Sequence, residues 1–168
     1  LVMGFVTLHQ SRLDDMLANS SVMHMGYVFL GIAAGTELGL KGAVMLMFAH
    51  GVSIALCFAL CGRMRNQVGT LEFDKLGGLA THAPFLTVVF AFGAFASIGL
   101  PGLANFAGEI MVFAGTFDPK ILSPEKLSSL QWTTILALWG VVISAVYMLR
   151  AYRKLFFGSA SSGHYLRD

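Results

Sequence analysis

Four long stretches of the chain contain no aspartate, glutamate, lysine or arginine. They cover residues 16–36, 42–62, 84–108 and 127–149, and each is at least 21 residues long. Crossing a bilayer core of about 30 Å takes roughly 20 apolar residues at 1.5 Å per residue. The pattern predicts an all-α polytopic membrane protein, because a helix satisfies its backbone hydrogen bonds within one segment when no water is present.

The chain is expected to form a single transmembrane domain over residues 1–168. The apolar stretch at its start has no charged residues before it, which is typical of a sequence cut within an earlier helix, so we interpret the sequence as a fragment. The predicted elements are the end of one helix at 1–9 and helices near 20–36, 42–62, 84–117 and 130–155.

The stretch 84–117 is too long for one straight span. As a continuous helix it would measure roughly 50 Å at 1.5 Å per residue. Gly99, Pro101 and Gly102 lie inside it, and proline removes a backbone donor while glycine allows unusual dihedral angles. We therefore expect either two short spans or one discontinuous helix that is broken at 99–105.

The distribution of basic residues favours the single discontinuous span. With one crossing at 84–117, eight basic residues share one side of the membrane and three lie on the other. With two crossings the split becomes six against five. Because basic loops concentrate in the cytoplasm, we expect one broken span and a cytoplasmic C-terminal tail. The group of eight is Arg12, Arg63, Arg65, Lys75, Arg150, Arg153, Lys154 and Arg167, and the group of three is Lys41, Lys120 and Lys126.

Composition excludes several classes of protein. The chain is 56% hydrophobic and 12% charged, whereas soluble domains carry about 25% charged residues. This argues against a soluble enzyme, a disordered tail and a nucleic-acid-binding domain. The net charge of +2 calls for no polyanionic partner.

Glu109 is the acidic residue that stands within a long apolar stretch. Carboxylates inside membranes are rare and usually mark ion or proton pathways, and discontinuous helices often form such sites. The alternative is a protonated glutamic acid that hydrogen-bonds between helices. His24 and His50 lie in two preceding apolar stretches, and histidine can relay protons near neutral pH. Each could instead be a packed, hydrogen-bonded residue, but together the three predict a hydrated proton path.

No cofactor is expected in this chain. It has neither a G-x-G-x-x-G loop nor a Walker lysine motif, and so should bind no nicotinamide or flavin. Cys57 and Cys61 are four residues apart in an apolar stretch and are expected to pack rather than bind metal. Tyr27, Tyr147 and Tyr152 are expected to act as interface anchors or packing residues.

Four short motifs lie along the chain. Residues 20–27 read S-S-V-M-H-M-G-Y, and residues 41–51 contain G-A followed by A-H-G. Residues 77–79 read G-G-L, and residues 99–109 read G-L-P-G-L-A-N-F-A-G-E. These motifs resemble those of the family of membrane subunit M (chain 4) of respiratory complex I, in which the last two belong to a broken helix. The blocks occur in the family order and extend over nearly the whole chain.

The resemblance implies the second inverted repeat of an antiporter-like subunit, from the end of its ninth helix through its thirteenth. His24 and His50 match the two histidines of its second half-channel, and Glu109 matches the glutamate of its broken twelfth helix, where related subunits usually have lysine. The implied function is proton translocation as a subunit of NADH:quinone oxidoreductase. NAD, FMN, iron–sulfur clusters and quinone are expected elsewhere in that complex. The implied partners are other membrane subunits, lipid and protons, in the bacterial inner membrane or its organelle equivalent.

One segment departs from the family pattern. The family usually has Q-x-D-x-K-R-x-x-A-Y before the S-S-V motif, whereas Arg12 here replaces the aspartate and Asp14-Asp15 replaces the Lys-Arg pair. This charge-reversed loop is compatible with a divergent copy. Two alternatives stay open: a subunit of a multi-subunit cation/proton antiporter or membrane-bound hydrogenase, and a non-catalytic remnant helix bundle.

Overall fold

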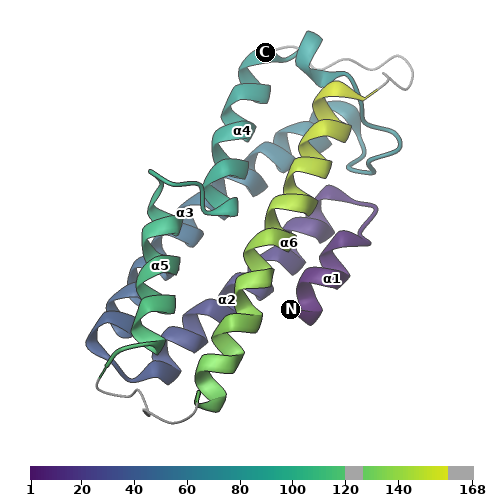
Figure 1. The fold of residues 1–168 in the computed structure, drawn as a ribbon. Helices are drawn as coiled ribbons and strands as arrows, with labels where there is room; N and C mark the ends of the chain where they lie inside the picture. The colour runs from purple at the N-terminus through teal and green to yellow at the C-terminus, as the bar shows by residue number, and fades with distance from the viewer. Residues whose placement is uncertain (120–126, 159–168) are drawn as a thin grey trace.

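The computed structural model describes residues 1–119 and 127–158, which form a bundle of helices (Figure 1). These two ranges contain α-helices, one short 3₁₀ helix named η1, and no β-strand. In chain order the elements are α1 (Val2–Leu8), α2 (Leu13–Ala34), α3 (Glu37–Val68), η1 (Leu79–Thr81), α4 (Pro84–Ile98), α5 (Ala104–Thr116) and α6 (Ser129–Phe157).

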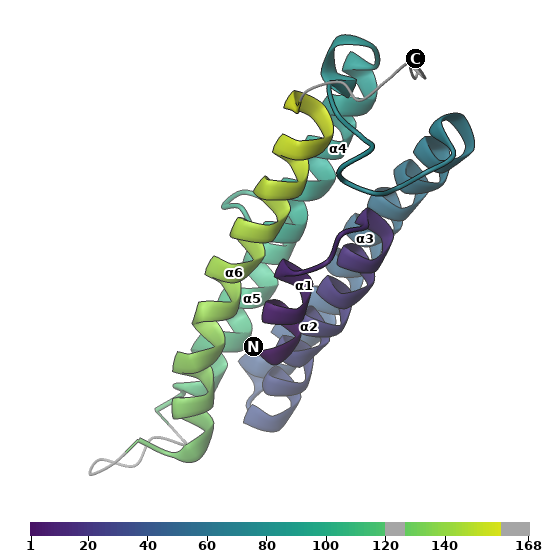
Figure 2. The same cartoon turned by 90° about the vertical axis from the view of Figure 1, so that its right-hand side faces the viewer.

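The predicted discontinuous helix is confirmed. Helices α2, α3 and α6 are each long and apolar enough to cross a membrane, whereas α4 and α5 have 15 and 13 residues. Each of these two measures roughly 20 Å, which is shorter than a bilayer core. They follow one another along the bundle beside the full length of α6 (Figures 1 and 2). Two half-length helices thus take the place of one span.

The break has a defined backbone geometry. Gly99 ends α4 with φ of 77°, and Gly102 has φ of 99°. Both values lie in the left-handed region that favours glycine. Asn105, which the sequence placed in the break, already belongs to the first turn of α5. The irregular segment is therefore residues 99–103.

Two helices extend beyond the boundaries expected from the apolar runs. Helix α2 begins at Leu13 rather than near residue 20 and carries Asp14 and Asp15 in its first turn. Helix α3 has 32 residues instead of the expected 42–62, with Glu37 in its first turn and Arg65 in its last. Acidic residues near a helix start and basic residues near its end suit the helix dipole. The uncharged runs marked the apolar part of each helix and missed these charged ends.

Helix α6 deviates little from the expected 130–155. Its N-terminus is a capping box, in which the Ser128 hydroxyl accepts from the Gln131 amide N–H and the Gln131 side chain accepts from the Ser128 N–H. These two contacts satisfy backbone donors that a helix start leaves open.

Glycines allow very close contact between α3 and α5. A Cβ atom on Gly115 would lie 2.5 Å from the backbone nitrogen of Gly39, and one on Gly42 would lie 2.7 Å from the nitrogen of Val112. Side chains larger than hydrogen have no room at these points, so the two backbones touch. This contact fixes the position of α5, which carries Glu109, against α3, which carries His50.

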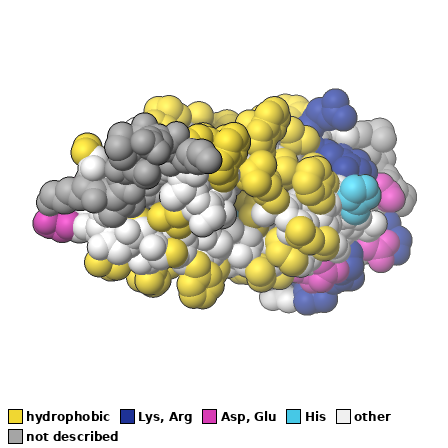
Figure 3. Space-filling model, turned by 60° about the horizontal axis from the view of Figure 1, so that its bottom comes forward, with side chains coloured by type: hydrophobic (Ala, Val, Ile, Leu, Met, Phe, Trp, Pro, Cys, Tyr) yellow, Lys and Arg dark blue, Asp and Glu magenta, His cyan; other side chains and the backbone are white. Residues whose placement is uncertain are grey.

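The outside of the bundle suits a lipid environment along its middle. Large apolar side chains such as Phe48, Phe92 and Trp139 are exposed. Figure 3 shows hydrophobic side chains over much of the visible face, with Lys and Arg gathered towards one end and Asp and Glu at both ends. This charge zoning and the long apolar helices make the protein a multi-pass membrane protein.

Candidate functional site: a buried histidine pair beside the broken helix

The structure brings His24 and His50 together. They come from the neighbouring helices α2 and α3, and their imidazole rings stack with centroids 4.8 Å apart and an interplanar angle of 20°. The side chains are buried, with 1% and 2% of their surface exposed. The two residues that the sequence could place only on separate helices therefore form one pair.

His24 connects its own helix to the end of α4. Its Nδ1 atom lies 2.8 Å from the carbonyl oxygen of Ser20, one turn earlier in α2. Its Nε2 atom lies 3.0 Å from the carbonyl oxygen of Ser97, in the last turn of α4. Both distances are within hydrogen-bonding range. The imidazole thus contacts the last turn of α4, directly before the helix break.

His50 has different partners. Its Nε2 atom lies 2.9 Å from the Ser21 hydroxyl oxygen, and its Nδ1 atom is buried without a hydrogen-bond partner in the described residues. The Ser53 hydroxyl donates to the His50 carbonyl oxygen at 3.1 Å, and the Asn105 side chain donates to the Ser53 hydroxyl at 3.3 Å. Polar contacts therefore run from α2 through α3 to the start of α5.

Glu109 lies on the other side of the break. Its side chain is 3% exposed, and a Cβ atom placed on Gly99 would lie 2.5 Å from its Oε2 atom. The absence of a side chain at residue 99 makes room for the carboxyl group. Within the described residues Glu109 forms no ion pair.

The residues of the break have unequal roles. Gly99 is buried against Glu109, whereas Pro101 and Gly102 are exposed. Gly99 therefore shapes the site directly, and the other two shape the turn that joins α4 to α5.

Ser20 and Tyr147 also lie at the site, although the sequence indicated neither of them as part of the proton path. The hydroxyl oxygens of Ser20 and Tyr147 are 2.5 Å apart, and both side chains are buried. Tyr147 lies on α6, so this contact connects α6 to the turn of α2 that holds His24. A serine four residues before a buried histidine was the available signal, since residues at this spacing share one helix face.

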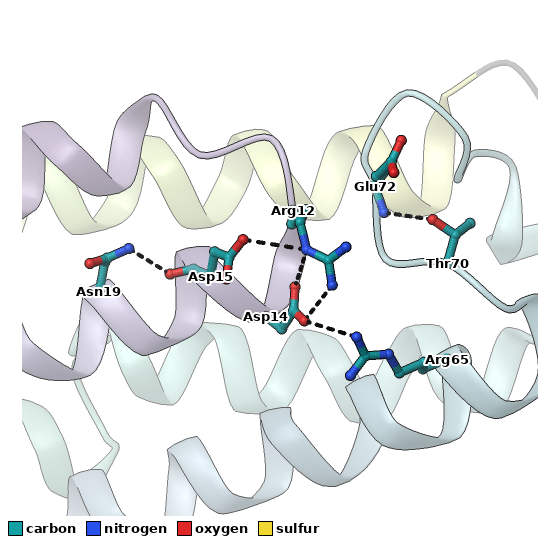
Figure 4. Close-up of polar contacts among 7 residues, drawn as sticks. All are labelled: Arg12, Asp14, Asp15, Asn19, Arg65, Thr70 and Glu72. Atoms are coloured by element: carbon teal, nitrogen blue, oxygen red, sulfur yellow. Dashed lines mark hydrogen bonds and ion pairs between the residues drawn. The ribbon is translucent and has the colours of Figure 1, made fainter.

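A second polar cluster lies at one end of the bundle (Figure 4). An Asp14 carboxylate oxygen lies 2.7 Å from Nη2 of Arg12 and 3.8 Å from Nη2 of Arg65, and Arg12 also pairs with Asp15 at 3.3 Å. The hydrogen bond to Asp14 is the main cause of the raised pKa of Arg12. The interpretation of Asp14 and Asp15 as part of a charge-reversed loop is wrong, because both residues form the first turn of α2 and pair with arginines.

The sequence of the chain matches the family described as NADH:quinone oxidoreductase/Mrp antiporter, transmembrane, over residues 1–124. The chain belongs to this family. It is 40% identical to the NAD(P)H-quinone oxidoreductase chain 4 1 of a Synechococcus species over 98% of this chain and 31% of that protein. It is 37% identical to NADH-quinone oxidoreductase subunit M of Pseudomonas aeruginosa over 95% of this chain and 29% of that protein.

The fold agrees with the family assignment. A chain of respiratory complex I from Thermus thermophilus superposes with a TM-score of 0.85 at 34% identity, over 97% of this chain and 33% of that chain. The chain spans about a third of the length of the family members it matches. The resemblance inferred from the motifs around His24, His50 and Glu109 is thereby confirmed at the level of family and fold.

Proposed function

We propose that this chain is part of a proton-translocating membrane subunit of NADH:quinone oxidoreductase. The observation that carries the proposal is the stacked pair of His24 and His50, placed by α2 and α3 beside a helix break that also holds Glu109. Ionisable groups at discontinuous membrane helices are a recurrent arrangement for moving ions and protons. The match to chain 4 and subunit M proteins supports the same function.

In this function the histidine pair passes protons between helices. Glu109 takes up or releases a proton when the charges around it change. Histidine exchanges protons near neutral pH, and a buried carboxylate changes its protonation when neighbouring charges change. The redox reaction takes place outside this chain, so NAD, FMN, iron–sulfur clusters and quinone belong to other subunits. The direct partners are other membrane subunits of the complex and the surrounding lipid.

The proposal is tested by His50→Gln in the intact complex, reconstituted in proteoliposomes with NADH and a quinone. Glutamine keeps a hydrogen bond to Ser21 but has no titratable proton. We expect NADH-driven proton transport to fall by up to about 10²-fold, the lower end of what positioned proton-transfer groups contribute. The matched control is His9→Gln, because His9 is exposed at the end of α1 and should leave transport unchanged. An unchanged ratio of protons to electrons in His50→Gln would remove the histidine pair from the path.

The same assay separates the alternative in the antiporter class. Proton transport that requires a sodium gradient and not NADH would assign the chain to a cation/proton antiporter. The similarity to quinone oxidoreductase chains favours the NADH-driven result.

We also propose that the end of the bundle bearing the connector between α3 and η1 faces the cytoplasm, together with the C-terminal tail. Lys154 near the end of α6 lies 3.3 Å from Asp74 in that connector, so both belong to one end. Arg12 and Arg65 meet at Asp14 in the cluster of Figure 4, whereas Lys41 pairs with Glu37 at the opposite end of α3. Basic residues favour the cytoplasmic side. Reporter fusions after Arg65 and after Gly158 should give the same sidedness, and opposite sidedness would overturn this orientation.

A further inference from the structure

The break in the membrane helix leaves the backbone carbonyl of Ser97 without an N–H donor from the described backbone. The N–H groups of Gly99 and Leu100 donate to the carbonyl oxygens of Ala96 and Phe95, which closes the end of the helix in the usual glycine-terminated manner. The next carbonyl, that of Ser97, would be paired with the N–H four residues later in a continuing helix. Residue 101 is proline and has no N–H.

His24 occupies the position of the missing donor. Its Nε2 atom lies 3.0 Å from the Ser97 oxygen, and its Nδ1 atom lies 2.8 Å from the Ser20 oxygen. A carbonyl oxygen only accepts hydrogen bonds, and a neutral imidazole has one N–H and one lone pair. A neutral His24 can therefore donate to one of these two carbonyls and must turn a lone pair towards the oxygen of the other. An imidazolium, with two N–H groups, donates to both.

The partner ring provides a contrast. His50 binds the Ser21 hydroxyl, which donates or accepts as required, and its other nitrogen has no partner among the described residues. Nothing in these contacts requires a second proton on His50. Two cationic rings stacked at 4.8 Å would repel each other. The pair is therefore arranged to hold one extra proton, and its acceptors place that proton on His24.

We propose that the second proton of His24 is bound between the backbone carbonyl oxygens of Ser20 and Ser97, and that its departure weakens the hold on the end of α4. This rests on the proposed function, because it assigns the extra proton to one member of the histidine pair. Loss of the proton leaves one N–H for two carbonyls. The Ser20 carbonyl also accepts the backbone N–H of His24 within α2, so the remaining N–H stays with Ser97, but its hydrogen bond is no longer charge-assisted. Because Ser97 lies at the end of a half-length helix, a weaker contact loosens α4 at the break, two residues before Gly99 and its neighbour Glu109.

Other titratable groups face this site from the helices packed around α2. They are Tyr27 on α2 itself, His50 on α3, Glu109 on α5 beyond Gly99, and Tyr147 on α6, the last through its contact with Ser20.

The test is a pH titration of the Ser97 carbonyl by solid-state NMR, with the protein in phosphatidylcholine bilayers. Serine labelled with ¹³C at the carbonyl and isoleucine labelled with ¹⁵N select the two Ser–Ile peptide units of the chain, Ser97–Ile98 and Ser53–Ile54. The Ser53 unit lies inside α3 and serves as an internal reference. Labelled histidine reports protonation of the His24 nitrogens in a parallel sample.

We expect both His24 nitrogens to carry protons at low pH. As the pH rises, one proton is lost and the Ser97 carbonyl signal shifts with the same midpoint, while the Ser53 signal stays in place. His24→Gln should make the Ser97 signal independent of pH. His9→Gln is the matched control, because Nδ1 of His9 contacts a carbonyl at the same four-residue spacing but His9 is exposed and far from α4 in the chain.

Two results would overturn the proposal. One is a His24 titration that leaves the Ser97 signal unmoved, and the other is a His24 ring that never takes a second proton over the pH range in which the protein stays folded. The wild-type measurement decides both even if His24→Gln fails to fold. A loss of pumping in His50→Gln together with a static Ser97 signal would remove this proposal and keep the proton path.

Discussion

In the intact complex, Glu109→Gln is expected to insert and assemble at near wild-type levels while proton pumping falls severely. Glutamine has nearly the volume of glutamate, so it fits the space opposite Gly99, but it cannot titrate. Because Glu109 is 3% exposed, bulk water has little access to replace it as a proton carrier. Positioned acids and bases contribute about 10²–10⁴-fold to proton transfer, and we expect a loss in this range. The measurement is the ratio of protons pumped to electrons transferred in proteoliposomes.

Two variants act as controls for this result. Glu109→Asp keeps the titratable group and should lose less, because water can bridge the shortened side chain. Glu37→Gln removes an exposed glutamate that pairs with Lys41 at the end of α3, and should leave pumping unchanged. Wild-type stoichiometry in Glu109→Gln would show that Glu109 is a packing residue.

Gly99→Ala is expected to abolish coupled proton transfer because it displaces the carboxyl group of Glu109. Two effects act at this residue. The backbone has φ of 77°, where a Cβ atom costs about 1–2 kcal/mol. The new methyl group would also stand 2.5 Å from Oε2 of Glu109, and the carboxyl group is the part that can move away. Stability should fall by about 1–2 kcal/mol from the backbone strain, whereas pumping should fall far more because the carboxylate is displaced.

Gly102→Ala separates these two effects. Gly102 also has a positive φ, of 99°, but a Cβ atom there would meet no atom within 4 Å. We expect a similar loss of stability in urea unfolding and a much smaller loss of pumping. In a Glu109→Ala background the contact is gone, so Gly99→Ala should then cost only its backbone strain. Equal pumping defects in Gly99→Ala and Gly102→Ala would refute the contact with Glu109.

The sequence predicted the spans and the break because each rests on a local rule. Uncharged runs of helical length report burial in lipid, and the grouping of Gly99, Pro101 and Gly102 reports a helix end irrespective of its surroundings. Positions far from these signals were less well predicted. The uncharged run at 42–62 predicted that α3 ends at residue 62. The helix continues to Val68, because arginine, which is present in its last turns, is compatible with an α-helix.

The contacts within the site could not be predicted in the same way. The approach of His24 to Ser97 joins residues 73 positions apart, and the stacking of His24 on His50 depends on how α2 turns against α3. A one-dimensional pattern does not contain the rotation of one helix relative to another. Tyr147 was interpreted as a packing or interface residue for this reason, since its contact with Ser20 arises only when α6 lies against α2.

The Asp14-Asp15 segment shows a different limit. Compared with the family pattern its charges are reversed, and the sequence alone gave no partner for them. The structure pairs Asp14 with Arg12, which is itself one of the changed residues, and with Arg65 from another helix. Compensation of this kind spans two elements and becomes visible only once both are placed.

The glycine contact between α3 and α5 also restricts the genetic variation that this region can accept. Gly115 and Gly42 each face backbone atoms at 2.5–2.7 Å from where a Cβ atom would stand. Every missense change of a glycine codon adds at least one carbon atom, so no substitution at these two positions is expected to be mild in its effect on the protein. A missense variant here would push α5 away from α3 and move Glu109 relative to His50 without altering a titratable residue. Harmful missense variants in this region should therefore include substitutions of packing glycines, which take no part in proton transfer themselves.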